Sequence, residues 1–332
     1  MSAGQSLVVG RAVETMLRSH RLRPWEALPW LAAIAAFFLF PDYLALGVEI
    51  FVAILLALSL DLLLGYAGIV TLGQAAFFGT GAYTAGLLAA HGWGEPLSSL
   101  LAGGAAAALL GLASGVIILR ARGLTLLMLT LVTAFMVQEG ANKASAITGG
   151  ADGLQGMDVW PVLGRFDFDI YSRTAYVYAL IVLFLAWYLV RRIVHSPFGR
   201  ALTGIRESEA RMHAIGSPVF RRRLTVYVIS AALAGVAGAL LAETTQFVAL
   251  EVLSFERSGS GLIMLIIGGV GRLYGAFVGV PLFIIAQDRF AAAYPLYWDF
   301  WIGILLVFIA LFAQGGVLGV AEQLWRRALR RR

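Results

Sequence analysis

The chain has 332 residues, of which 60% are hydrophobic and 13% are charged, and its formal net charge is +6. A soluble domain carries roughly 25% charged residues, so the polar residues here are too few to cover a soluble globule. Cysteine is absent, which excludes disulfides, thiolate metal sites and a cysteine nucleophile. The composition predicts a membrane protein, whose positive charge we assign to solvated rims at the membrane rather than to nucleic-acid binding.

Apolar runs bounded by glycine, proline or charged residues predict an all-α, polytopic membrane protein of about ten transmembrane helices. Segment 1–26 precedes the first span, and a basic tail at 320–332 follows the last. Pro41-Asp42 interrupts the first apolar run without a small-residue cleavage site, so we expect an uncleaved first span. The predicted spans are 27–45, 47–64, 73–91, 97–119, 123–139, 174–193, 223–245, 257–272, 275–292 and 297–319.

The distribution of arginine predicts the orientation of these spans. Cytoplasmic loops of membrane proteins carry an excess of Lys and Arg, and a cytoplasmic N-terminus places twenty of the 25 basic residues on the inner side. Both termini are then cytoplasmic, in a bacterial inner membrane. An outer loop at about 140–173 and an inner loop at about 194–222 are longer than simple connectors require, but neither is large enough to form a separate domain.

Several kinds of catalytic chemistry are missing from the sequence. A P-loop needs a Lys after its glycines, but Lys143 is the only lysine and Ala144 follows it. No histidine pair has the i, i+4 spacing of a helical zinc site; the histidines are His20, His91, His195 and His213. We therefore expect no catalytic residue, no metal and no cofactor in this chain, and an intramembrane enzyme is disfavoured because no acid, base and nucleophile converge on a motif.

Four carboxylates lie in or near the predicted spans, all close to span ends: Asp61, Glu139, Glu243 and Asp288. Acids within a membrane are candidate ion or proton sites, and they also serve as interfacial or capping groups. A self-sufficient secondary transporter or channel would need such buried carboxylates to couple ions, so this class of protein stays an alternative.

Glycine recurs at positions 65, 68, 73, 79, 81 and 86. Repeated glycine lets helices approach closely and lets the backbone leave helical geometry, and a broken helix exposes backbone groups that can hold a polar solute. Close helix packing is the alternative interpretation of these glycines. The predicted substrate-pathway residues are Tyr66, Gly68, Thr71, Gly73 and Gln74.

The inner loop predicts an amphipathic helix over residues 196–216. Ser196 is a plausible N-cap, Pro197 fits the first helical position, and Gly216 fits the stop. Its mixed charges favour docking of a partner protein over a purely basic, lipid-binding face. The predicted docking residues are Arg200, Ile205, Arg206, Glu207, Glu209, Ala210, Met212 and Gly216.

Five stretches together resemble the LivM-type permeases of branched-chain amino-acid ABC transporters, in the right order over about residues 45–315. They are Gly65 to Gly86, Arg122-Gly123-Leu124 with Leu129-Thr130-Leu131, Thr148 to Leu154, Ser196 to Gly216, and Gly268 to Gly271 with Gly275. The resemblance implies a second homologous permease subunit, two cytoplasmic ATPases that bind ATP and Mg, and a periplasmic substrate-binding protein. It also implies that the inner loop is the segment that meets the ATPase.

The resemblance has departures. Glu209-Ala210 and Gly216 are similar to the family's coupling signature, but Arg211 replaces a second alanine and the glycine falls one residue late. Ile69 and Thr71 stand where relatives often have Gln and Ser, although Thr71 keeps a hydroxyl. The expected function is inward transport of branched-chain amino acids by alternating access, with urea or short amides as alternative substrates.

Overall fold

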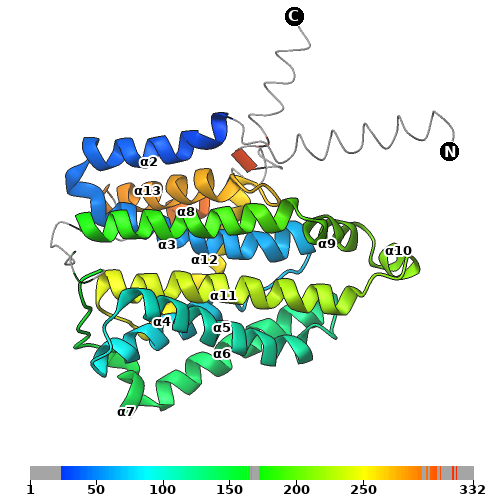
Figure 1. The fold of residues 1–332 in the computed structure, drawn as a ribbon, viewed down its shortest axis with the longest axis horizontal. Helices are drawn as coiled ribbons and strands as arrows, with labels where there is room; N and C mark the ends of the chain where they lie inside the picture. The colour runs from blue at the N-terminus through cyan, green and yellow to red at the C-terminus, as the bar shows by residue number, and fades with distance from the viewer. Residues whose placement is uncertain are drawn as a thin grey trace, which may run out of the picture.

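The computed structural model describes residues 24–304 apart from 163, 165, 167–171, 294–296 and 298–299, together with 307, 316, 317 and 319. Within these residues the fold is all-helical, and β-structure is limited to the isolated bridges Leu154–Val248 and Val162–Phe166. The helices lie roughly alongside one another in a bundle (Figure 1). The all-α prediction is therefore confirmed.

The long helices are α3 (Leu44–Asp61), α5 (Pro96–Ile118), α6 (Gly123–Lys143), α8 (Arg173–His195), α11 (Val219–Thr245) and α13 (Gly275–Ala293). The shorter ones are α2 (Leu28–Leu39), α4 (Gln74–Ala90), α7 (Ser145–Thr148), α9 (Pro197–Glu207), α10 (Glu209–Ala214) and α12 (Phe255–Gly268). Five single-turn elements complete the described fold: η1 (Pro24–Ala27), η2 (Pro41–Tyr43), the π-helical turn η3 (Leu62–Ala67), η4 (Gly150–Asp152) and η5 (Leu250–Leu253).

Six helical segments in the described part of the chain are long and apolar enough to cross a membrane. Three predicted spans hold shorter helices instead, namely α2, α4 and α12. The 12 residues of α2 rise only about 18 Å at 1.5 Å per residue, which is less than the hydrocarbon thickness of about 30 Å. The span predicted at 297–319 lies largely outside the described residues, so the total of ten stays a prediction.

Helix α11 is packed along α4, α5 and α3 in the interior of the bundle, and glycines set its distance from α4 and α5. A Cβ atom placed on Gly103 of α5 would lie 2.9 Å from the carbonyl oxygen of Gly81 in α4. A Cβ atom on Gly235 of α11 would lie 2.6 Å from the carbonyl oxygen of Gly103. Small residues allow such close approach of helix backbones, so the three helices touch backbone to backbone.

The connectors gather at two opposite ends of the bundle, with α9 and α10 at one end and α7 at the other (Figure 1). At the α7 end, the Trp160 amide donates to the Gly94 carbonyl at 2.8 Å. At the α9 end, Arg122 pairs with Glu209 of α10. Loops that the arginine distribution assigns to one side of the membrane thus lie together, while the side that faces the cytoplasm stays a prediction.

Candidate functional site

Two helix breaks meet at the α9 end of the bundle. The first runs through η3 and the non-helical residues 68–73, and the second spans residues 269–274 between α12 and α13. The amide of Gly271 donates to Asp61 Oδ1 at 2.7 Å. A Cβ atom on Gly65 would lie 2.6 Å from the Gly271 nitrogen, so the two backbones touch. Residues 68–73 are not helical, and residues 269–274 include turns that join α12 to α13.

Each break contains a glycine in the left-handed backbone region. The φ angle of Gly68 is +68°, and that of Gly271 is +76°. L-residues with a side chain adopt such angles at a cost, so the direction that the chain takes after each break depends on these glycines. Asp61 caps the second break through its bond to Gly271, which agrees with the capping interpretation of this carboxylate.

Two predicted pathway residues, Thr71 within the first break and Gln74 directly after it, are buried between helices. The Gln74 amide donates to Ser59 Oγ at 2.8 Å and to Ser230 Oγ at 3.0 Å, joining α4 to α3 and α11. Thr71 Oγ1 accepts a hydrogen bond from the Gly73 amide at 3.1 Å. These hydrogen bonds stabilise the start of α4 and its packing against α3 and α11.

The other pathway residues lie beside neighbouring backbone. A Cβ atom on Gly73 would lie 2.7 Å from the Thr130 carbonyl oxygen of α6, and the half-buried Tyr66 lies beside the Leu273 backbone in the second break. The structure therefore brings the predicted pathway segment together with α3, α6, α11 and residues 269–274. Whether solute passes along it stays a prediction.

The predicted docking segment begins and ends where the sequence indicates. Ser196 caps α9 by accepting a hydrogen bond from the Gly199 amide, with Pro197 as the first helical residue. Gly216 has φ +78° and lies beyond the end of α10. The prediction of one continuous helix is wrong, however, because the backbone of Ser208 is extended and its side chain caps α10. Two short helices form instead.

Helix α9 is packed onto the first break. Its Leu202 and Ile205 side chains are buried, and α9 contacts η3, α8 and α11. Arg206 donates a hydrogen bond from Nη1 to the carbonyl oxygen of Gly65. Met212 of α10 folds back onto α9, with its sulfur 2.9 Å from the Cβ position of Gly204. Ile205, Arg206 and Met212 therefore contact this chain itself.

The charged docking residues divide into two groups. Glu209 accepts a hydrogen bond from Arg122 at 3.1 Å and has Arg223 at 3.8 Å, so this carboxylate is engaged within the chain. Sequence spacing does not reveal these two cations, which come from Arg122 before α6 and from Arg223 in α11. Arg200, Glu207, Ala210 and Gly216 are exposed and remain available to a partner.

Glu243 forms a buried hydrogen-bond network at the α7 end. Its carboxylate accepts from Ser99 Oγ at 2.6 Å and from the Tyr178 hydroxyl at 2.8 Å, which joins α11 to α5 and α8. Only 3% of Glu243 is exposed. A buried carboxylate needs such donors, so these contacts give Glu243 a structural role.

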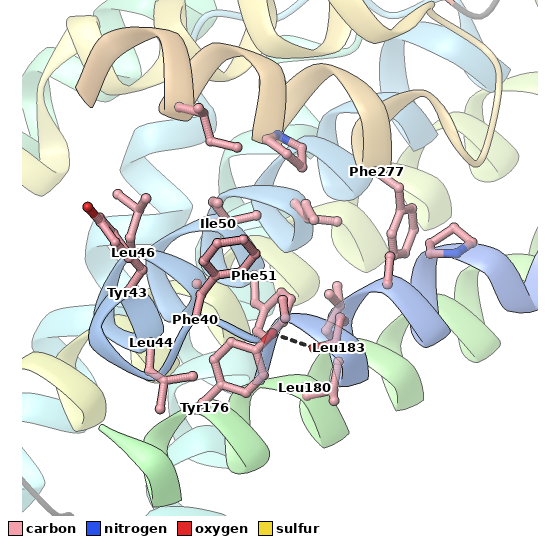
Figure 2. A pocket seen from close by; sticks show the side chains of 18 of the residues that line it. Phe40, Tyr43, Leu44, Leu46, Ile50, Phe51, Tyr176, Leu180, Leu183 and Phe277 are labelled. Atoms are coloured by element: carbon pink, nitrogen blue, oxygen red, sulfur yellow. Dashed lines mark hydrogen bonds between the residues drawn. The ribbon is translucent and has the colours of Figure 1, made fainter. Parts of the chain in front are cut away.

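An apolar cavity of about 510 Å³ lies between α2, α3, α8 and α13. Figure 2 shows Phe51, Tyr176 and Phe277 around it, and the Tyr176 hydroxyl donates to the Ala33 carbonyl at 2.8 Å. Asp288 and Arg289 are the charged residues in its lining. The predicted pathway residues are not among those that line it. The cavity therefore suits apolar groups and is separate from the two helix breaks.

Sequence reasoning did not single out Ser59 or Ser230 and gave Thr130 no contact, yet these residues accept hydrogen bonds from Leu72 and Gln74. All three are buried. Their signal in the sequence is a lone hydroxyl within an apolar span, and such residues need a partner inside a membrane. The partner itself lies far away along the chain, because Ser230 and Gln74 are separated by 156 positions.

Comparisons with known proteins agree with this architecture. Residues 43–310 match the family described as "Branched-chain amino acid transport system / permease component". The chain is 29% identical over 262 residues to the "High-affinity branched-chain amino acid transport system permease protein LivM" of Escherichia coli (strain K12), which covers 71% of this chain and 60% of that protein. The protein of the same description from Salmonella typhimurium gives the same values.

A third relative is the "Probable branched-chain amino acid transport permease protein LivM" of Methanocaldococcus jannaschii, 31% identical over 116 residues, or 34% of either chain. No solved structure gives a significant match. The alignment spans 60% of the length of the first two relatives. With a match over residues 43–310, the chain belongs to the family of branched-chain amino-acid transport permease components.

Proposed function

We propose that this chain is a transmembrane subunit of an ABC importer that moves branched-chain and other hydrophobic amino acids into the cell. Family membership supports a transport subunit rather than an enzyme. A second homologous permease subunit would complete the pathway, a periplasmic binding protein would deliver the substrate, and two cytoplasmic ATPases would hydrolyse ATP. Alternating access would then be driven from outside this chain.

The observation that carries the proposal is the packing of α9 directly onto the π-helical turn η3. Leu202 and Ile205 anchor α9 in the bundle, while Arg200 and Glu207 are exposed. Coupling between distant sites travels through packed side chains and rigid elements. A displacement of α9 by a bound ATPase would be transmitted directly to the broken helix, because no other segment of the described chain lies between them.

The competing function, a self-sufficient secondary transporter, needs carboxylates that are free to bind ions. Glu243 accepts hydrogen bonds from two hydroxyls, and Asp61 accepts one from the Gly271 amide. Glu243 and one carboxylate oxygen of Asp61 therefore have structural partners within the described residues. Urea and short amides stay alternative substrates within the ABC proposal.

Reconstitution in liposomes tests the function. This chain, its sister permease, the two ATPases and the binding protein should together import leucine only when ATP and Mg are supplied on the ATPase side. The chain alone, with a proton or sodium gradient, should import none. Gradient-driven leucine uptake by the chain alone would overturn the proposal, and calorimetry on the binding protein would separate amino acids from urea and amides.

A further inference from the structure

Arg206 contacts both helix breaks at once. Its Nη1 atom donates to the Gly65 carbonyl in the first break and lies 3.0 Å from the Cβ position of Gly271 in the second. Its Cγ atom lies 3.0 Å from the Cβ position of Gly68. One side chain from α9 thus lies against Gly68 and Gly271, whose lack of a side chain makes room for it, and it bonds to the Gly65 carbonyl.

Asp61 lies on the other side of the same contact. One carboxylate oxygen accepts from the Gly271 amide, and the other is buried with no hydrogen-bond partner among the described residues. Only 2% of Asp61 is exposed. A buried carboxylate without compensation is costly, and the Arg206 guanidinium is close enough to attract this charge.

The residue types suit a link between backbones. A guanidinium offers several donors in a fixed plane, so it can hold a carbonyl oxygen while its charge faces a carboxylate. Gly65 and Gly271 are the points where the two breaks touch, and Arg206 and Asp61 each bond to one of them. These four residues form a continuous series of contacts, from Arg206 through Gly65 and Gly271 to Asp61, which we call the clasp.

We propose that the clasp makes α9 move together with both helix breaks, and that Arg206 is the positioning residue that connects them. The inference deepens the proposed function, on which it rests, by assigning the route from the docking helix to the broken helices. Displacement of α9 changes the positions of Gly65 and Gly271 together, because Arg206 and Asp61 hold the two backbones at one point.

The test measures leucine import and ATP hydrolysis in the same proteoliposomes that hold the full complex. Arg206→Gln should leave ATP hydrolysis near the wild-type rate and lower the leucine imported per ATP about tenfold, the factor that corresponds to one hydrogen bond of a charged group. Arg206→Lys keeps the charge and should recover part of that ratio. A purely structural role would lower both rates together as the amount of assembled complex falls.

Two further variants sharpen the test. Arg192→Gln removes an exposed arginine of α8 outside the clasp and should keep the wild-type ratio of import to hydrolysis. Asp61→Asn removes the charge but keeps an acceptor for the Gly271 amide, so it should lower the ratio less than Arg206→Gln. The double variant should be no worse than Arg206→Gln alone, because residues that act through one contact are not additive.

The outcomes separate the clasp from the proposed function. If the wild-type complex imports leucine with ATP and the Arg206→Gln variant imports as much leucine per ATP, the clasp proposal is overturned. The proposed function then stands. A wild-type complex without ATP-driven import overturns the function. If Arg206→Gln does not assemble, Arg206→Lys decides, since an unchanged ratio contradicts the clasp and a lowered ratio supports it.

Discussion

The carboxylate of Glu209 lies 3.1 Å from the guanidinium of Arg122, and the two residues are 87 positions apart in the sequence. This pair connects α10 to the start of α6, and Arg223 of α11 lies 3.8 Å from the same oxygen. Glu207 is exposed and forms no ion pair within the described residues. The two glutamates are therefore suited to different tests of docking.

Glu207→Lys should weaken the binding of the ATPase subunit to the permease. Reversal of an exposed charge at an interface replaces attraction by like-charge repulsion, which costs several kcal/mol in favourable cases. Co-purification of the ATPase and substrate-stimulated ATP hydrolysis would measure the effect. Equal recovery of the ATPase with the variant and the wild type would contradict a docking role for Glu207.

Glu209→Gln is the matched comparison within the same segment. Arg122 is exposed and Glu209 is partly buried, so loss of their ion pair should destabilise α10 by about 1 kcal/mol. The variant should retain most of the bound ATPase. A loss of the ATPase as large as that caused by Glu207→Lys would show that the placement of α10 matters as much as the exposed charge.

Gly73→Leu should abolish leucine uptake while the protein still inserts into the membrane. A Cβ atom at this position would lie 2.7 Å from the Thr130 carbonyl oxygen, so α4 and α6 have to separate. Uptake by cells that express normal amounts of the variant is the measurement. Gly140→Leu in α6 is the control, because no atom lies within 4 Å of its Cβ position, and it should transport normally.

Ser230→Ala should lower the thermal stability of the purified complex. Ser230 accepts a hydrogen bond from Gln74 and donates one to the Ser59 carbonyl, and it is fully buried. Each lost buried hydrogen bond costs about 1 kcal/mol, and more where a partner is left unsatisfied. Thr133→Ala removes a hydroxyl that bonds only within its own helix and should change the midpoint of thermal unfolding little.

The same measurement distinguishes packing from transport at Gln74. If Gln74 only joins helices, Gln74→Leu should alter the unfolding temperature and leave the apparent affinity for leucine unchanged. A change in apparent affinity without a change in unfolding temperature would instead place Gln74 in contact with the solute.

Tyr178→Phe should destabilise the protein by about 1–3 kcal/mol, because it removes one of two hydroxyl donors from the buried Glu243 carboxylate. Unfolding temperature in detergent would report the loss. Tyr188→Phe is the matched control on the same helix, since Tyr188 is 49% exposed. Equal unfolding temperatures for Tyr178→Phe and Tyr188→Phe would argue against a structural role for the network.

Local sequence signals predicted several of these features. Ser196, Pro197 and Gly216 mark the ends of the docking segment because caps and stops depend on a few adjacent residues. The recurring glycines around position 68 likewise indicate a break, and Gly68 has a positive φ, which is a property of single positions. The extended backbone at Ser208 was missed, because Ser208 fits a helix interior as well as an N-cap.

Contacts between distant parts of the chain could not be predicted in this way. Arg206 and Gly65 are 141 positions apart, and their contact depends on how α9 folds back onto η3. The charge pattern of α9 places Arg206 with the exposed residues, as the structure does, but it does not reveal the Gly65 carbonyl that its guanidinium reaches. The ion-pair partners of Glu209 could not be predicted for the same reason. A helical pattern indicates the helix face on which a residue lies, but not the neighbouring element that this face contacts.

The backbone contacts of Gly81, Gly103 and Gly235 restrict how the transporter changes shape. Helices whose backbones touch have no side chains between them that could repack as the helices slide. Close-packed interiors also resist gradual deformation. If the proposed transport cycle moves these helices, we therefore expect α4, α5 and α11 to move as one rigid body. We expect the hinges of that cycle to lie outside this body, in the non-helical residues 68–73, where the chain enters α4, and 269–274.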